Sequence, residues 1–366
     1  MLSKVCIFCG SPPSGKNKEH VLPQWLIRTT GSPSRKVYLG RDWSSPELKR
    51  RVYSLSAFTF PACSVCNSDF AALEASAKSI VEHLLAAQPV SASDFDILLD
   101  WFDKVRIGLW IGLLYLNKNY RDVDPQFYIK SRIATRDRLL MIYQDQGELD
   151  GLSICGVESP IFQVMPSCFG LTINNLHFFN ASAQDLLSTF LGFPHLINRK
   201  LSKDREGFSA DVVPGSKTIL ANLLPYSAPA GGTGIFQGII PPELRNSAEF
   251  NDPFIVSNCW DHARGRGKIF MQQMGPAGLY PEEPSSQWLP PQQFSKLECM
   301  MDQVFLTDVY LTRLYSERPD MSDLTQEQRD FVEKSTSGIL KLHKVMIEHV
   351  TRQIQTSNSI ERFTAD

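Results

Sequence analysis

Two long amphipathic helices are the clearest elements that the pattern of apolar and polar positions predicts. Apolar residues recur every three to four positions over 70–85, which predicts a helix that begins at the second cysteine pair and ends before Pro89. A second helix is expected after a cap at Ser93 or Asp94, with an apolar face over 95–113. We expect these two helices to pack against each other.

Shorter elements are predicted on either side of the two helices. Apolar runs punctuated by Ser, Pro and Gly indicate strands and loops before the first helix, at 37–39 and 52–55. The remaining predictions are strands at 161–164, 170–173 and 177–179, a short helix at 183–191, a Pro- and Gly-rich loop or linker at 225–238, and closing helices at 294–315 and 325–353.

Length and composition are those of an ordinary globular protein. The chain has 366 residues, which favours two domains, and its 43% hydrophobic and 21% charged residues exclude wholesale disorder or a collagen-like fibre. The most apolar run, 107–116, is too short to span a bilayer, and no secretory leader opens the chain. We therefore expect a soluble, cytoplasmic protein without a membrane partner, whose eight cysteines are thiols or metal ligands.

The net charge of −2 hides a marked asymmetry along the chain. Residues 1–51 contain ten Lys and Arg against three Asp and Glu, so this segment carries +7 and the remainder carries −9. A basic segment of this kind is typical of a surface that contacts a polyanion, although charge clusters are more often simply solvated. The candidate nucleic-acid contacts are Lys16, Lys18, Arg28, Arg50 and Arg51.

Four of the cysteines form two Cys-x2-Cys pairs, Cys6 with Cys9 and Cys63 with Cys66, separated by 53 residues. A short turn in each pair can present both thiolates to one tetrahedral zinc ion. The alternative is a chance pairing of buried free cysteines. The spacing favours structural Zn²⁺, and the long separation means that the intervening chain contributes structure of its own.

Further candidate residues lie between the pairs and just after them. Glu19-His20 is followed by aliphatic residues and Pro23, and Asn67 directly follows Cys66. This pattern resembles the HNH nuclease superfamily, whose ββα-metal motif is often built on a treble-clef zinc finger. In that family an acid–histidine dipeptide lies on the first strand, and Cys-x2-Cys followed by His or Asn opens the helix. The resemblance covers residues 1–90.

The resemblance implies a role for each matching residue. His20 resembles the general base that deprotonates a water, and an imidazole is suited to this task near neutral pH. Glu19 and Asn67 resemble the oxygen ligands of a catalytic Mg²⁺ or Mn²⁺, while Cys6, Cys9, Cys63 and Cys66 would hold structural zinc. The implied activity is metal-dependent hydrolysis of phosphodiester bonds in DNA, with RNA as the alternative substrate.

The sequence departs from the family pattern in one respect. HNH motifs usually carry a middle Asn that orients the His, and 51–62 contains none. Glu74 lies two helical turns after Asn67 and near the same face, so it is a further candidate ligand or an ordinary solvated carboxylate. Which residue replaces the middle Asn stays open at this point.

Two other hypotheses compete with the nuclease. One is a catalytically silent treble-clef module that binds nucleic acid or protein. The other is an enzyme whose active site lies around His262, where Arg264 and Arg266 adjoin glycines that would let the backbone approach an anion. The missing Asn keeps both alternatives open.

Together these observations predict an α+β protein. Residues 1–90 form a small zinc-stabilised ββα-metal domain, and 91–366 form a larger mixed domain with C-terminal helices. The larger domain is expected to serve regulation, recognition of a signal ligand or protein partner, or oligomerisation as a homodimer. By analogy of architecture alone, this arrangement is similar to bacterial restriction and anti-phage effectors.

Overall fold

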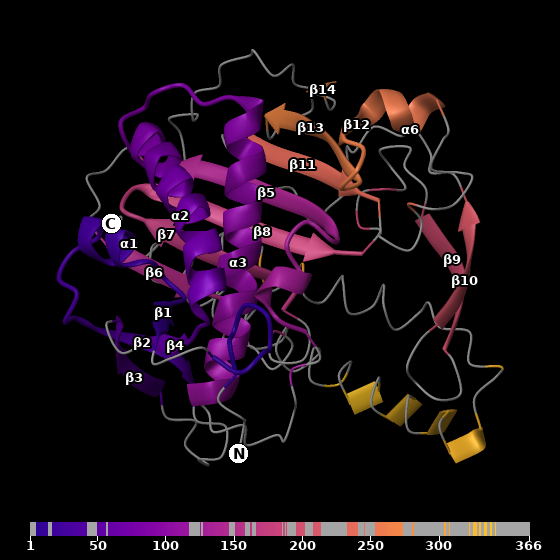
Figure 1. Cartoon of the computed structure of the whole chain (residues 1–366), viewed down its shortest axis with the longest axis horizontal. Helices are drawn as coiled ribbons and strands as arrows, with labels where there is room; N and C mark the ends of the chain where they lie inside the picture. Colours follow the sequence, from indigo (N-terminus) through magenta and orange to yellow (C-terminus); the bar gives the residue numbers. More distant parts are fainter. Residues whose placement is uncertain are drawn as a thin grey trace, which may run out of the picture.

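The computed structural model contains both helices and strands, arranged around one large antiparallel sheet (Figure 1). The described residues are 5–13, 17–41, 50–55, 58–116, 125, 127–145, 151–157, 162, 166–184, 186, 188, 195–201, 208–213, 233–240, 245, 253–273, 280–281 and scattered positions between 304 and 341. Within this part of the chain, no helix is both long and apolar enough to cross a bilayer.

The N-terminal region consists of two antiparallel strand pairs and two helices. Strand β1 (Lys18–His20) pairs with the distant β4 (Thr59–Pro61), and β2 (Lys36–Arg41) pairs with β3 (Arg50–Ser54). Helix α1 (Gln24–Thr29) follows β1, and α2 (Ser64–Leu85) follows β4. The strands expected near 37–39 and 52–55 are therefore confirmed as β2 and β3.

Helix α3 (Ala92–Leu116) packs beside α2 and crosses the face of the main sheet (Figure 1). A reciprocal pair caps its start: the Asp94 backbone N–H donates to Ser91 Oγ at 3.3 Å, and the Ser91 N–H donates to the Asp94 carboxylate at 2.8 Å. The cap is thus Ser91 rather than Ser93 or Asp94, because Asp94 occupies the third helical position and reaches back.

The main sheet has eight strands among the described residues, in the order β12-β13-β11-β5-β8-β7-β6, with β14 paired to β13. Every pairing is antiparallel. Its strands are β5 (Asp137–Gln144), β6 (Leu152–Cys155), β7 (Cys168–Ile173), β8 (Leu176–Ala183), β11 (Thr233–Ile239), β12 (Cys259–Asp261), β13 (Arg266–Gln273) and β14 (Tyr280–Pro281). The smaller elements are η2 (Ile129–Ser131), α6 (Pro253–Asn258) and the hairpin of β9 (His195–Leu201) with β10 (Phe208–Val213).

Strand β11 occupies part of the segment that was predicted to be a linker. Residues 233–238 of the predicted 225–238 segment form part of this strand, while 225–232 lie outside the described residues. The linker was predicted from the Pro and Gly content of this segment. Ile235, Phe236 and Ile239 are buried instead, and this end of the segment forms a strand of the sheet. The strand at 161–164, the helix at 183–191 and the two closing helices also lie mostly outside the described residues.

Helix α3 is buried on almost every side because it packs against both the N-terminal region and the sheet. One continuous hydrophobic core runs from Cys6 through α2 and α3 to Met271 in β13. On the N-terminal side, the ring centroids of Trp101 and Trp25 are 5.9 Å apart, and Gly112 packs against the ring of Phe60 in β4. The charged residues of α3 must therefore find partners inside the protein.

Gly112 allows this close approach and gives a test of the packing. A Cβ added at Gly112 would lie 2.8 Å from Phe60 Cζ, so Gly112→Ala is expected to destabilise the protein by about 1–3 kcal/mol in urea unfolding. The control is Gly338→Ala, because a Cβ at Gly338 meets nothing within 4 Å and the substitution in a helix gains up to about 1 kcal/mol. Equal stability of the two variants would contradict this packing.

Candidate metal centre and adjoining polar site

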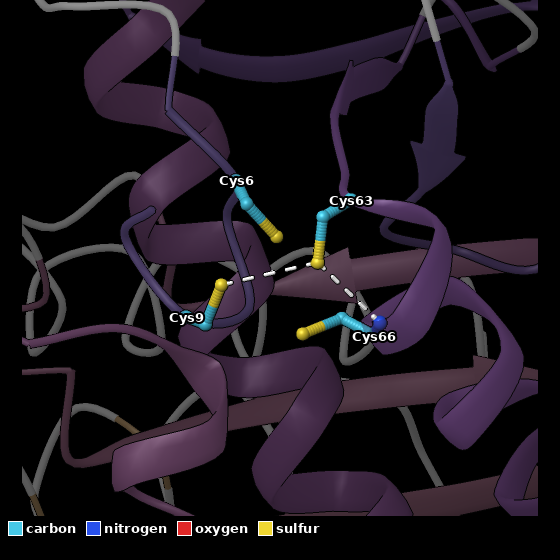
Figure 2. A group of neighbouring side chains, drawn as sticks. All are labelled: Cys6, Cys9, Cys63 and Cys66. Atoms are coloured by element: carbon cyan, nitrogen blue, oxygen red, sulfur yellow. Dashed lines mark hydrogen bonds between the residues drawn. The ribbon is translucent and has the colours of Figure 1, made fainter. Parts of the chain in front are cut away.

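The four paired cysteines converge on one point (Figure 2). Cys6 and Cys9 lie on a tight turn, closed by a 2.8 Å hydrogen bond from the Gly10 N–H to the Cys6 carbonyl. Gly10 has φ of 77° and lies against the Tyr128 ring, so a side chain there would meet both backbone strain and a clash. Cys63 caps α2, and its sulfur accepts a hydrogen bond from the Cys66 N–H at 3.4 Å.

The spacing of the sulfurs fits a tetrahedral zinc ion. All four Sγ atoms lie within 4.8 Å of one another, and Cys9 Sγ is 4.0 Å from Cys63 Sγ. Tetrahedral Zn–S bonds of about 2.3 Å require sulfur separations of about 3.8 Å, so a small contraction completes the site. The cluster is thus a four-cysteine site that could hold zinc.

The thiols differ in how readily they lose a proton. Burial raises the pKa values of the Cys6 and Cys66 thiols. Burial also acts to raise the pKa of Cys9, but hydrogen bonds from Ser11 outweigh it and lower the value to about 7. Cys9 therefore ionises more easily than Cys6 and Cys66, and its thiolate is suited to bind a cation.

Strand β1 pairs with β4, so the acid–histidine motif lies beside the strand that leads into α2. Glu19 pairs with Phe60 and His20 with Thr59. Asn67 lies in the first turn of α2, where its backbone N–H donates to the Cys63 carbonyl at 3.0 Å. The cysteine cluster thus fixes the beginning of the helix that carries Asn67.

Lys104 of α3 joins this site, although no sequence motif pointed to it. Its side chain is 1% exposed, and its ammonium lies 3.5 Å from Glu19 Oε1 and contacts the Glu74 carboxylate directly. Three elements, β1, α2 and α3, therefore meet at one lysine. From the sequence, Glu74 was either a metal ligand or a solvated surface carboxylate. In the structure it is the ion-pair partner of Lys104, and only 16% of its side chain is exposed.

The electrostatics follow from this burial. Burial raises the pKa of the Glu19 carboxyl, against the opposing effect of Lys104. Burial also lowers the pKa of Lys104 to about 8, which still leaves the ammonium mostly charged at neutral pH. Burial and the nearby Lys104 charge both lower the pKa of His20, so its imidazole is neutral at pH 7 and keeps a lone pair.

Two polar atoms of the predicted site are buried and make no hydrogen bond within the described structure: His20 Nδ1 and Asn67 Oδ1. Buried polar atoms are paired in most proteins, and exceptions often mark a position that a water, an ion or a substrate fills. The other ring nitrogen of His20, Nε2, lies 3.0 Å from Gln24 Nε2. The structure shows no direct contact between Asn67 and Glu19 or His20.

The predicted nucleic-acid contacts are placed only in part. Lys18 on β1 and Arg28 on α1 are exposed. The backbones of Arg50 and Arg51 belong to β3, which is hydrogen-bonded to β2, and Lys16 lies outside the described residues. Two of the five predicted positions are therefore described as surface cations.

A second charged cluster joins α3 to the sheet. Arg266 of β13 donates to Asp96 at 2.6 Å and to Asp100 at 2.8 Å, and Arg138 of β5 contacts the same two carboxylates. One turn on, Asp103 pairs with Arg106 at 2.6 Å. The cluster balances three carboxylates against three guanidinium groups. Both Nη atoms of Arg266 are therefore engaged by carboxylates of α3, whereas Arg264 is exposed.

Comparison of the chain with protein-family models, with curated proteins and with solved structures finds no match. The assignment of the site therefore rests on its residues and their geometry.

Proposed function

We propose that residues 1–90 form an HNH-type, metal-dependent endonuclease module on a treble-clef zinc scaffold. The arrangement of the four cysteines, the pairing of β1 with β4 and the start of α2 supports this proposal. The observation that carries it is the pair of buried, unpartnered atoms His20 Nδ1 and Asn67 Oδ1, both on residues that the motif singles out.

Glu19 and Asn67 carry the oxygen atoms that would bind a hard divalent cation such as Mg²⁺ or Mn²⁺ in this proposal. Asn67 offers a buried oxygen with no other partner, and the described ion pair of Glu19 engages Oε1. Glu74 offsets the charge of Lys104, so the three charged groups together keep the net negative charge that a cation needs. When bound, the cation would neutralise charge on the scissile phosphate.

His20 is the residue that we assign to proton abstraction. Its lowered pKa keeps the imidazole neutral at physiological pH, which is the state that accepts a proton from water. Exposed Lys18 and Arg28 would contact the phosphates of DNA and guide the backbone towards this residue. Hydrolysis would break one P–O bond and add the elements of one water, which would leave a hydroxyl on one terminus and a phosphate on the other.

One observation favours the catalytically silent alternative. The ammonium of Lys104 already contacts both Glu19 and Glu74, and a cation at Glu19 would lie near this positive charge. If the ion pair excludes the metal, the module would only bind nucleic acid or protein.

Cleavage of supercoiled plasmid by zinc-loaded protein in Mg²⁺ or Mn²⁺ distinguishes the nuclease from the catalytically silent binding module. We expect nicked or linear products from the wild type and a rate lower by on the order of 10²–10⁴-fold for His20→Ala. The control is His83→Ala, which removes an exposed histidine from the last turn of α2. Equal cleavage by His20→Ala, or no cleavage by folded wild type with any cation, would reject the nuclease.

A further inference from the structure

A short polar relay on the surface of α1 ends at His20. Gln24 opens α1 four residues after His20, and Arg28 follows one turn later on the same side of the helix. Gln24 Nε2 lies 3.0 Å from His20 Nε2, and Arg28 Nη2 donates to Gln24 Oε1 at 3.3 Å. Both Gln24 and Arg28 are exposed to solvent.

The chemistry of Arg28 fixes the direction of every hydrogen bond in the relay. A guanidinium group has donors and no acceptor, so the Gln24 atom that faces it must be the amide oxygen. The NH₂ group of Gln24 then faces His20, and Nε2 of the neutral ring must accept. The ring proton is consequently on Nδ1, the atom that is buried without a partner.

This tautomer cannot act as a base. A neutral imidazole has one lone pair, and here Gln24 occupies it at Nε2. A half-turn of the Gln24 amide would reverse the arrangement, with Oε1 accepting from an Nε2–H group and the lone pair now on Nδ1. The turned amide would point its own N–H groups at Arg28, so the turn requires Arg28 to leave.

We propose that Arg28 and Gln24 form a substrate-sensing relay that selects the tautomer of His20, with a phosphodiester backbone as the ligand that draws Arg28 away. A charge-assisted contact with a phosphate is stronger than the exposed bond to a neutral amide. Once Arg28 moves, Gln24 turns. The ring loses the proton on Nδ1 and takes up one from solvent at Nε2, so it is neutral before and after the exchange.

Gln24 is in this account a positioning residue, and its catalytic consequence rests on the proposed nuclease function. The relay also answers the question of the missing middle Asn, because Gln24 supplies a side-chain amide to the imidazole from α1 instead. The tautomer itself can be measured without any cleavage.

The test is nitrogen-15 NMR of protein with labelled histidine rings, with and without a short DNA duplex and without added divalent cation. Free wild type should show His20 with its proton on Nδ1, and DNA should move the proton to Nε2. Gln24→Glu offers only acceptors and should hold the Nε2–H form without DNA. Arg28→Met should raise the ratio of Nε2–H to Nδ1–H several-fold, because a buried Nδ1–H lacks an acceptor.

Two controls separate the relay from general effects of charge. Lys18→Met removes the same charge from a neighbouring exposed position and should leave the free tautomer unchanged, and exposed His83 reports on the labelled sample itself. The same His20 tautomer in wild type, Gln24→Glu and Arg28→Met would overturn the relay, even if DNA is cleaved. The expected tautomers in a protein that never cleaves would uphold the relay and reject the nuclease.

Discussion

Replacement of Lys104 by methionine is expected to lower the free energy of unfolding by about 3 kcal/mol, measured by urea denaturation. The substitution keeps the length and the apolar stem of the side chain but removes the ammonium that contacts Glu19 and Glu74. These two carboxylates are largely buried, so they would be left close together without a counter-charge. Glu74→Gln in the Lys104→Met background removes one of them and should recover part of the loss.

The chain offers a matched control for this prediction. Lys78 pairs with Glu82 at 3.6 Å on the exposed face of α2, with about half of each side chain in solvent. Lys78→Met should therefore change stability by no more than about 0.5 kcal/mol. Equal effects of Lys78→Met and Lys104→Met would show that Lys104 does not hold β1, α2 and α3 together.

The second large effect is expected from the cysteine cluster. Cys63→Ser should lose stoichiometric zinc in metal analysis of the purified protein, and the N-terminal region should then unfold at markedly lower temperature. Structural four-thiolate sites bind zinc with an apparent free energy of about 10 kcal/mol or more, and this energy stabilises the fold. Cys63 also caps α2, and a serine hydroxyl can accept the same hydrogen bond from the Cys66 N–H, so the expected loss of stability reports on the metal and not on the helix cap.

Cys259→Ser provides the comparison, because Cys259 lies outside the cluster, in β12 of the main sheet. This variant should have the same zinc content and the same unfolding temperature as the wild type. Wild-type protein purified without zinc, or a Cys63→Ser variant with an unchanged zinc content, would contradict a structural metal site at these four residues.

The sequence anticipated the parts of the fold that depend on local pattern. The spacing of Phe70, Ala77, Ile80 and Leu84 predicted α2, and these residues are buried along it. The two cysteine pairs predicted a common site because a Cys-x2-Cys turn brings its own sulfurs together, and the structure joins the pairs. The mixture of helices and strands was also expected, whereas the strand order of the sheet depends on long-range pairing that no local pattern records.

The site residues that sequence analysis missed are those supplied by distant elements. Lys104 lies 85 positions after Glu19 in the sequence. The apolar pattern of its helix predicts burial but not the partner of a buried lysine. A signal was present, because Asp103, Lys104 and Arg106 interrupt a segment that is otherwise apolar, and charges there require buried partners. Gln24 lies outside 51–62, the segment in which the family pattern places its orienting Asn, so the motif gives no signal for its contact with His20.

The most direct test of the central claim is anomalous X-ray scattering from crystals of the zinc-loaded protein with a bound DNA duplex, soaked in Mn²⁺. We expect two different metal positions: zinc bound by the four cysteine sulfurs, and manganese bound by Glu19 and Asn67 next to His20. A zinc peak at the cysteines with no manganese at Glu19 and Asn67, under conditions where Mn²⁺ and a bound DNA duplex are both present, would contradict it.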